Sequence, residues 1–312
     1  MHAASASVRV PATSANLGPG FDCLGLALGI LDEVTATVTP EPGVRVVVRG
    51  EGAAEVPADE NHLVVRALRS TFDEIGVAQP RGLLLTCTNR VPHGRGLGSS
   101  AAAVVAGVLL GRALGGAAAD DGAALGAATR LEGHPDNAAA ALLGGATVAW
   151  LDDTGARAVR LDVHDDVVPL VMLASGRLAT HHARAVLPAS ISHQDASFTV
   201  SRAALLVHAL TREPALLLAA TADRLHQRQR RSAMPETIDL VERLRDLGVA
   251  AVVSGAGPAV LVLSTVDREE RDRAALAGLA GAGGSWRLFA PGVHRAPTVP
   301  TVPTVATVAT VR

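Results

Sequence analysis

Apolar residues follow strand-like and helix-like spacings through the first half of the chain. Alternation with a period of two indicates strands, and apolar residues three or four apart indicate helices. The predicted strands are residues 8–10, 23–28, 34–48 and 83–88. The predicted helices are residues 63–75, residues 101–114 and a third helix that ends near Glu132. A Gly/Pro-rich segment at 11–20 separates the first two strands and predicts a loop.

The second half repeats this mixture of helices and strands. Its predicted helices are residues 201–210, 216–224 and 238–247, and two strands flank residues 254–258. Acidic residues replace Ala-rich sequence around 152–166, so we predict one domain over 1–160 and another over 161–293. From Pro297 onward, Pro-Thr-Val and Ala-Thr-Val units offer no amphipathic face, and we predict a disordered low-complexity tail over 294–312.

Composition limits the classes of partner. The 312 residues are 48% hydrophobic but only 2% aromatic, so Ala, Val and Leu must fill the core. A net charge of -2 gives no basic field for polyanions, and we expect no nucleic-acid partner. No apolar stretch reaches the length of a bilayer span, which predicts a cytoplasmic protein without membrane contact. Cys23 and Cys87 form no CxxC pair and are expected to be reduced and structural.

The chain contains no lysine, so all 28 basic residues are arginine. A Walker A loop requires a lysine that reaches the phosphates, and a pyridoxal phosphate enzyme requires one for its Schiff base. Both classes are therefore excluded.

The glycine-rich segment before the helix at 101–114 predicts a phosphate loop. Three glycines let the backbone approach an anion, and the free amides and positive dipole end of the following helix attract phosphate. The predicted phosphate-binding residues are Pro92, His93, Gly94, Arg95, Gly96, Leu97, Gly98, Ser99, Ser100, Ala101 and Ala102. A Rossmann loop would need a third glycine where Ser99 stands. A tight turn capped by Ser99 is the simpler alternative.

Two oxygen donors indicate a magnesium site beside this loop. Ser100 falls in the first helical turn, and Glu132 is the best carboxylate candidate. Magnesium binds oxygen ligands and keeps several waters, so one hydroxyl and one carboxylate suffice. Glu132 precedes a polar cluster, Gly133 to Asn137, set within apolar sequence, which suggests a lined cavity. Zinc at His134 and Asp136 is disfavoured because their spacing lacks the HExxH pattern.

Two further segments carry candidate polar groups. Asn16 and Asp22 flank a kinked Gly-Pro-Gly segment and could point to the same side, although an Asx-turn residue and a strand-edge acid are the simpler interpretation. Ser254, Gly255, Ala256 and Gly257 lie between two apolar strands, as a tight turn or as a loop close to a ligand.

Three motifs in order resemble the GHMP kinase superfamily. They are Pro11 to Asp22, Gly94 to Ser100 and Ser254 to Pro258. Within that superfamily, four segments look like the homoserine kinase family: residues 9–25, 132–137, 183–188 and 223–227. The resemblance runs from Val8 to about Val293 and leaves out the tail. It implies an α+β fold of two lobes, an N-terminal nucleotide-binding lobe and a C-terminal α/β sandwich lobe with a cleft between them.

The resemblance also implies roles for individual residues. ATP would bind the phosphate loop, with Mg²⁺ held by Ser100 and Glu132. Arg184 and Arg230 would meet the carboxylate of L-homoserine. The pocket for L-homoserine would be lined by Asn16, Asp22, His134 and Asp136. Such carboxylates and guanidinium groups suit the ammonium and the carboxylate of an amino acid.

The implied reaction is phosphorylation of the L-homoserine side-chain hydroxyl, a step in threonine biosynthesis. Asn137 stands where mevalonate-type relatives place a catalytic Asp, and an amide cannot act as a general base. The resemblance therefore implies direct in-line attack, aided by positioning and charge stabilisation. Another GHMP kinase activity or a silent metabolite sensor are the alternatives. The oligomeric state is left open, with a homodimer as one candidate.

The sequence departs from the family pattern in a few places. Arg228 and Arg231 stand beside Arg230 where relatives commonly show Pro and Ala, so the substrate arginine could be assigned one residue off. Thr199 replaces an expected Asn, and His93 replaces an apolar residue. These changes remove no charge that the chemistry needs.

Overall fold

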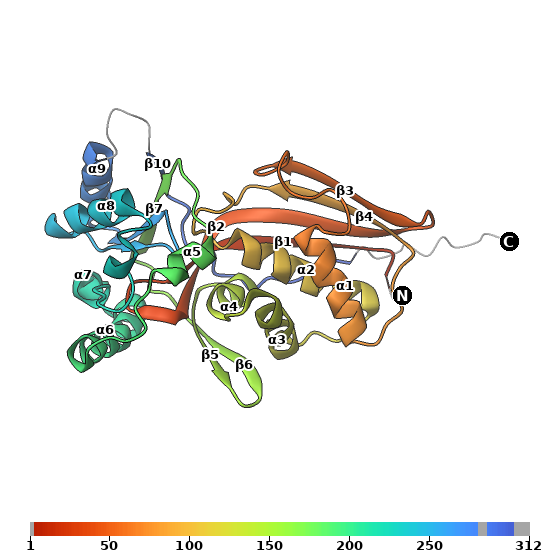
Figure 1. Ribbon diagram of the computed structural model, residues 1–312, viewed down its shortest axis with the longest axis horizontal. Helices are drawn as coiled ribbons and strands as arrows, with labels where there is room; N and C mark the ends of the chain where they lie inside the picture. Colours follow the sequence, from red (N-terminus) through yellow and green to blue (C-terminus); the bar gives the residue numbers. More distant parts are fainter. Residues whose placement is uncertain (1–2, 280–285, 303–312) are drawn as a thin grey trace.

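The computed structural model describes residues 3–279 and 286–302 and divides them between two lobes that lie along its long axis (Figure 1). A six-stranded sheet forms the N-terminal lobe, in the order β3-β4-β2-β5-β6 with β1 paired to β2. Its strands are β1 (Ser5–Asn16), β2 (Gly20–Thr39), β3 (Gly43–Gly50), β4 (Gly82–Asn89), β5 (Ala146–Asp152) and β6 (Gly155–Leu161). The β3 and β4 pair is parallel, and the other neighbours are antiparallel.

Four helices cover this sheet and form one apolar core with it. They are α1 (Leu63–Glu74), α2 (Ser99–Gly115), α3 (Asp121–Glu132) and α4 (Asp136–Leu143). The helix predicted at 101–114 is confirmed as α2, whose buried residues lie on most of its sides. The helix predicted at 63–75 is α1, and the helix predicted to end near Glu132 is α3.

The C-terminal lobe contains an antiparallel sheet in the order β10-β7-β9-β8. Its strands are β7 (Val167–Ala174), β8 (Ala251–Val253), β9 (Val260–Thr265) and β10 (Trp286–Phe289). Its helices are α5 (Thr180–Ala185), α6 (His193–Thr211), α7 (Leu217–Ala220), α8 (Pro235–Asp246) and α9 (Glu269–Leu279), with 3₁₀ turns at Pro214–Leu216 and Arg228–Arg230.

Alternate residues of β7 pack into two different apolar clusters. Val171 and Leu173 face the cluster that contains α6 and α7, whereas Leu170 and Met172 face the cluster that contains α8. This alternation follows from the period of two along a strand, and it places helices on both faces of the sheet. The predicted two-lobed α+β architecture with a C-terminal α/β sandwich is confirmed.

The β1 and β2 hairpin joins the lobes. Val34 and Ala36 of β2 lie in the N-terminal core, whereas Leu24 and Leu28 of the same strand lie in a cluster shared with the C-terminal lobe. The turn of this hairpin, residues 17–19, therefore lies where the lobes meet.

The prediction of a loop at 11–20 is wrong for most of that segment. β1 continues to Asn16, with a register shift after Pro11. Proline is tolerated in strands at such irregularities, and Ala12 to Ala15 are buried small residues that let other segments approach the strand. The helix predicted at 216–224 is also shorter, because α7 ends at Ala220.

The composition change at 152–166 has two structural sources. Residues 153–154 form the turn between β5 and β6, and the chain passes from one sheet to the other between Leu161 and Val167. A domain boundary near residue 160 stays a prediction.

The prediction that the chain is disordered from residue 294 onward is wrong for residues 294–302. This segment pairs with the N-terminal lobe through its backbone, at Ser7 with Thr301, and His294 donates its amide to the Ala27 carbonyl at 3.0 Å. Thr298 is buried and donates its amide to the Leu142 carbonyl at 2.8 Å. Strand-edge pairing needs no amphipathic face, which is why the repeat gave no signal. Residues 303–312 of the predicted tail lie outside the described residues.

Among the described helices, none has the length and apolarity to cross a bilayer.

Candidate active site

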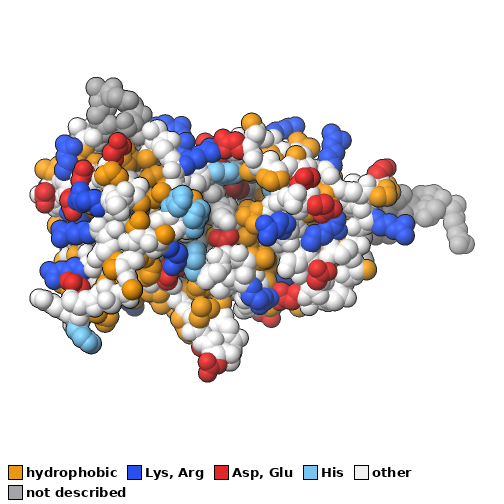
Figure 2. Space-filling model, viewed as in Figure 1, with side chains coloured by type: hydrophobic (Ala, Val, Ile, Leu, Met, Phe, Trp, Pro, Cys, Tyr) orange, Lys and Arg blue, Asp and Glu red, His pale blue; other side chains and the backbone are white. Residues whose placement is uncertain are grey.

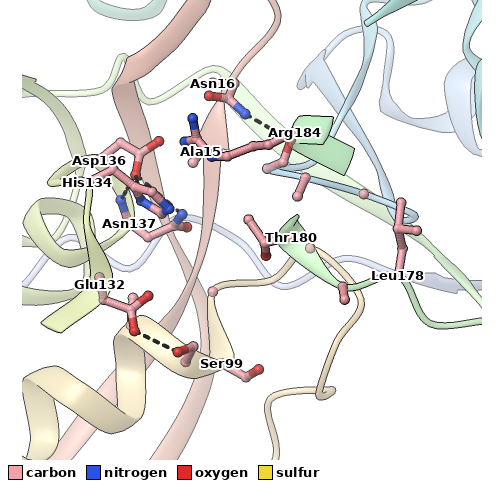
Figure 3. A pocket seen from close by; sticks show the side chains of 18 of the residues that line it. Ala15, Asn16, Ser99, Glu132, His134, Asp136, Asn137, Leu178, Thr180 and Arg184 are labelled. Atoms are coloured by element: carbon pink, nitrogen blue, oxygen red, sulfur yellow. Dashed lines mark hydrogen bonds and ion pairs between the residues drawn. The ribbon is translucent and has the colours of Figure 1, made fainter. Parts of the chain in front are cut away.

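A cavity of about 390 Å³ opens between the two lobes (Figures 2 and 3). Five segments line it: the end of β1 and the start of β2, the phosphate loop with the start of α2, residues 131–137, residues 178–184 with α5, and the glycine loop before β9 together with Arg230. Figure 3 shows Glu132 beside the start of α2, and His134, Asp136 and Asn137 clustered across the cavity from Thr180. The segments come from both lobes, so the cavity forms only in the folded chain.

The phosphate loop has the backbone geometry of an anion site. Gly94, Gly96 and Gly98 all have positive φ, and α2 begins directly after Gly98. A Cβ at Gly98 would lie 1.9 Å from Thr13 Oγ1, so no other residue fits there without movement. The first amides of α2 have no carbonyl partner within the helix and carry its positive dipole end. An anion in the cavity would meet these donors.

Both lobes hold this loop in place. Leu178 donates its amide to the Gly94 carbonyl at 3.0 Å, and Ser254 donates its hydroxyl to the Gly96 carbonyl at 2.6 Å. Thr13 of β1 donates its amide to the Leu97 carbonyl at 3.0 Å. Because the loop's carbonyls are engaged with neighbouring segments, its amides are the groups left for a ligand.

Ser100 and Glu132 form a pair of hard oxygen donors at the start of α2. The Ser100 hydroxyl donates to Glu132 Oε1 at 2.6 Å. Burial raises the pKa of Glu132 above its usual value, and the hydrogen bond from Ser100 opposes that shift. A hydroxyl and a carboxylate at this distance fit a small cation that prefers oxygen ligands. Among the described residues, no group of three or more His, Cys, Asp or Glu side chains is placed to hold a metal ion.

His134, Asp136 and Asn137 form a hydrogen-bonded group at the start of α4. His134 Nδ1 lies 3.0 Å from Asp136 Oδ1, and this bond raises the pKa of His134. The Asn137 side-chain oxygen accepts a bond from Thr13 Oγ1 at 2.7 Å. Asp136 is almost fully buried, and its Oδ1 also accepts the Asn137 amide at 2.7 Å. The imidazole is thus held beside a fixed carboxylate.

Asn16 holds the hairpin turn rather than projecting freely. Its Nδ2 donates to the Gly255 carbonyl at 2.8 Å, and its Oδ1 accepts the Asp22 amide at 3.0 Å. Asn16, Leu17 and Asp22 have left-handed φ values, which Asn and Asp tolerate better than other residues. Asn16 therefore positions Asp22 and links the turn to the glycine loop.

Two arginines face the cavity from the C-terminal lobe. Arg184 donates to both oxygens of Asp22, at 3.0 and 2.5 Å, and this pairing raises the pKa of Arg184. Arg230 is buried, with Nε on the Ala183 carbonyl and Nη1 on both the Gly255 carbonyl and His226 Nδ1, each at 3.1 Å. Burial, reinforced by the charge of Arg184, lowers the pKa of Arg230 to about 10. Its Nη2 has no bond to any described residue.

Arg228 and Arg231 point away from this site. Arg228 lies 3.4 Å from Glu242, and Arg231 pairs with Asp239 and Glu242 on the surface of the C-terminal lobe. Of the three neighbouring arginines, Arg230 is the one that lines the cavity.

Most residues predicted from the sequence come together in this one cavity. Six do not line it: Pro92, His93, Arg95, Leu97, Ala102 and Ser254. Sequence reasoning missed Ala15, Leu131, Leu178, Ala179 and Thr180. The last three lie between the loop that follows β7 and the first residue of α5, and a loop after an apolar strand was the one available signal.

A second cavity of about 260 Å³ adjoins the phosphate loop on the N-terminal lobe. It shares Ser99 and Ser100 with the first cavity. Its walls are largely apolar and include Val34, Val56 and Pro57. His62 also lines it, is buried, and its Nδ1 has no partner among the described residues. Burial lowers the pKa of His62, so this imidazole is neutral at physiological pH.

Comparisons with known proteins agree on one family. The model of the GHMP kinases N terminal domain matches residues 62–145, and that of the GHMP kinases C terminal matches residues 204–285. Homoserine kinase from Streptomyces coelicolor is 54% identical over 272 residues, which cover 86% of this chain and 87% of the relative. Homoserine kinase from Clavibacter michiganensis is 55% identical over 260 residues, covering 83% and 82%.

Solved structures extend the likeness over nearly the whole chain. The crystal structure of homoserine kinase from Cytophaga hutchinsonii superposes with a TM-score of 0.83 at 26% identity, covering 96% of this chain and 98% of that one. A mevalonate kinase structure, at 13% identity and a TM-score of 0.62, covers 93% of this chain and 99% of that one and shares the fold alone. The chain therefore belongs to the homoserine kinase family of the GHMP kinases.

Proposed function

We propose that this chain transfers the γ-phosphoryl group of ATP to the side-chain hydroxyl of L-homoserine and so forms O-phospho-L-homoserine. One observation carries the proposal: an anion-binding helix start and a set of paired opposite charges line the same cavity. The curated relatives are homoserine kinases, which supports the substrate. We also propose that the reaction serves threonine biosynthesis and takes place in the cytoplasm.

The charges around Asp22 suit a zwitterionic substrate. Asp22 and Arg184 form an ion pair at the cavity and neutralise each other's charge. An amino acid carries one ammonium and one carboxylate, so it can replace that pairing by offering each group a new partner. The Nη2 of Arg230, which bonds to no described residue, would add a second donor for the carboxylate, since a buried guanidinium binds carboxylates strongly. The substrate would thereby be fixed at the end that does not react.

Ser100 and Glu132 would hold Mg²⁺ beside the phosphates, where the ion would neutralise phosphate charge during transfer. The amides of Ser99 and of the residues that follow it would bind the phosphate oxygens at the start of α2. Phosphoryl transfer passes through a loose transition state that requires mainly alignment and charge stabilisation.

The amide of Asn137 cannot take a proton, so the hydroxyl would attack directly. The bond from Thr13 fixes Asn137, and the bond from Asp136 fixes His134. Both side chains would therefore position the hydroxyl without reorganising. This pre-organisation supplies rate in the way that a fixed near-attack geometry does.

The second cavity would receive the nucleoside of ATP. It adjoins the phosphate loop and has apolar walls suited to a base. The unpartnered Nδ1 of His62 is placed to accept or donate a hydrogen bond at that base. A nucleotide lying across Ser99 and Ser100 would then reach from one cavity into the other.

A substrate panel tests the proposal. Purified chain with ATP and Mg²⁺ is offered L-homoserine, mevalonate, galactose and L-serine, and ADP formation is measured. ADP is expected with L-homoserine alone. ADP formed with mevalonate or galactose instead would assign another activity of the same kinase family.

Two substitutions test the cation site. Ser100→Ala and Glu132→Gln should each lower turnover by about 10²-fold or more, because each removes a ligand that also supports charge stabilisation. Circular dichroism checks that the fold is intact in both variants. Turnover near that of the wild type in both variants at low Mg²⁺ would refute the assignment.

A further inference from the structure

A third cavity, of about 510 Å³, lies within the C-terminal lobe and shares no lining residue with the cavity between the lobes. It is bordered by the end of α6, the 3₁₀ turn and α7 on one side, and by the end of β9 and the start of α9 on the other. β9 leads from the glycine loop to this cavity. Its six residues separate the two sites by about 20 Å at the usual rise per residue.

Asp272 lines this cavity with an unsatisfied carboxylate. The residue is only 1% exposed. Its Oδ2 accepts the Ser264 hydroxyl at 2.7 Å, whereas its Oδ1 has no hydrogen-bond partner among the described residues. A buried acceptor, charged above all, is normally paired, and leaving it without a donor costs stability. Because Asp272 is one of the residues that line the cavity, a donor held there would lie beside this carboxylate.

Most other charged groups around the cavity already have partners. Asp267 accepts the Thr265 hydroxyl at 2.5 Å, and Arg268 donates to the Gly248 carbonyl at 2.7 Å. Glu213 pairs with His208 at 3.2 Å. The exception is Arg212 at the end of α6, an exposed arginine on the rim that makes no ion pair with a described residue. One buried carboxylate oxygen and one guanidinium therefore remain unpaired in the same cavity.

We propose that this cavity binds a small L-α-amino acid. Its ammonium would donate to Asp272 Oδ1, and its carboxylate would accept from Arg212. Its side chain would lie against Leu217, Leu218 and Leu263, which belong to the apolar part of the cavity wall. A bare metal ion is a poorer match, because the described residues offer no cluster of three metal-ligating side chains.

Binding experiments on the full chain test this site. The twenty common L-α-amino acids are screened by saturation-transfer NMR, and those that bind are titrated calorimetrically. Asp272→Asn keeps the shape and the Ser264 bond but removes the charge, and Arg212→Met removes the guanidinium. Each should weaken binding of the screened amino acid by about tenfold or more, the usual effect of losing one charge-assisted bond. Asp239→Asn and Arg228→Met, on the surface and outside the cavity, should leave binding unchanged.

Single-charge probes and the kinase assay complete the test. Ethylammonium and propionate each keep only one of the two contacts and should bind much more weakly than the amino acid. Turnover of ATP with L-homoserine should stay within about twofold in Arg212→Met, because the sites are separate.

The proposal is overturned if no amino acid binds in the millimolar range, or if binding is insensitive to both Asp272→Asn and Arg212→Met. Should Asp272→Asn fail to fold, Arg212→Met and the single-charge probes decide alone. A chain without kinase activity that still binds an amino acid at Asp272 would refute the proposed function and leave this site standing.

Discussion

Neighbouring arginines in one short segment have opposite environments. Arg230 is buried against Ala183, Gly255 and His226, whereas Arg228 and Arg231 pair with acids on the surface. A 3₁₀ turn spans Arg228–Arg230, and successive residues of such a turn point about 120° apart. Two adjacent positions in the sequence, 230 and 231, thus place one arginine at the cavity between the lobes and the other at the surface.

Replacing Arg230 should affect one substrate only. Arg230→Met should raise KM for L-homoserine by about 10- to 150-fold, because a charge-assisted contact to a carboxylate contributes roughly 1.5–3 kcal/mol. KM for ATP should hardly change. Arg230→Lys should recover only part of the loss, since an ammonium keeps the charge but cannot keep the bonds to Ala183, Gly255 and His226 that hold the guanidinium in place. Steady-state kinetics with each substrate varied in turn measure both constants.

Arg228→Met and Arg231→Met serve as the controls. Both remove an arginine of the same segment without touching the cavity, so KM for L-homoserine should stay within about twofold. A large increase in either control, with none in Arg230→Met, would move the carboxylate contact to a different arginine.

His226 couples the turn of the hairpin to Arg230. It is fully buried, donates from Nε2 to the Gly18 carbonyl at 2.7 Å and accepts from Arg230 at Nδ1. This arrangement requires the neutral imidazole. Burial lowers its pKa from the ordinary value of 6.5.

That lowered pKa makes stability depend on pH in a defined direction. The unfolded chain takes up the proton of His226 more readily than the folded chain does. The contribution to folding is therefore present above pH 6.5 and lost as the pH falls below it, by up to about 1.4 kcal/mol per pH unit. Urea unfolding between pH 7 and 5 should show a shallower loss for His226→Gln than for the wild type. His193→Gln, at an exposed position, should follow the wild-type slope, and equal slopes in all three proteins would contradict this account.

For single residues, the sequence predicts the charged groups of the cavity better than its apolar lining. Glu132 and Asp136 could be proposed because acids within Ala-rich sequence are unusual. Leu178 and Ala179 could not, because apolar residues are common everywhere and only the folded chain places them at the cavity. The pairing of Asp22 with Arg184 was equally hidden, since it joins residues 162 positions apart.

Among the elements, helices were predicted well and the central hairpin poorly. The apolar spacing of α1 and the continuous apolar run of α2 depend on local sequence. β1 beyond Val10 is different: its Pro, Thr and Ser residues are typical of loops, yet they form a strand because α2, the phosphate loop and the glycine loop close over them. Tertiary contacts decide such a segment, so its local composition misleads.

The junction of the phosphate loop and α2 has no room for an added methyl group at Gly98. Gly98→Ala places a Cβ 1.9 Å from Thr13 Oγ1 and 3.0 Å from Asn137 Oδ1, at a φ of 67°. The left-handed backbone alone costs about 1–2 kcal/mol. We expect Tm to fall by several degrees and turnover to fall by about tenfold or more, because the start of α2 must shift away from the phosphates.

Gly126→Ala provides the matched control inside α3. A Cβ there meets only the end of the Arg130 side chain, at 3.4 Å, and alanine is the better helix former by about 1 kcal/mol. Its Tm should rise slightly with unchanged turnover. If Gly98→Ala behaves like Gly126→Ala, the loop geometry is not as constrained as the close approach to Thr13 indicates.

Across the whole molecule, the lobes are joined at both ends of the chain. The β1 and β2 hairpin reaches from the N-terminal sheet into the C-terminal core, and the chain after β10 returns to pair with β1 and β2. Arg295 adds a bond to the Val163 carbonyl in the connection between the sheets, at 2.6 Å. The segment after residue 293 thus crosses back over the boundary that the sequence suggested.

Truncation after Ala296 should therefore destabilise the protein. It removes two backbone bonds between Ser7 and Thr301, at 2.9 and 2.7 Å, and two bonds from Thr298 to Ala141 and Leu142. At a net 0.5–1.5 kcal/mol for each bond, the loss is about 2–6 kcal/mol, or a fall in Tm of at least about 4 °C. Thermal unfolding of the truncated chain measures it.

A chain that ends at Val302 separates the contribution of residues 297–302 from that of the residues beyond, and should unfold at a higher temperature than the chain that ends at Ala296. Thr298→Val should reproduce part of the loss, since its hydroxyl donates to Ala141, whereas Val299→Ala should have little effect because Val299 is 67% exposed. An unchanged Tm after truncation at Ala296 would mean that the backbone pairing of this segment contributes nothing to folding.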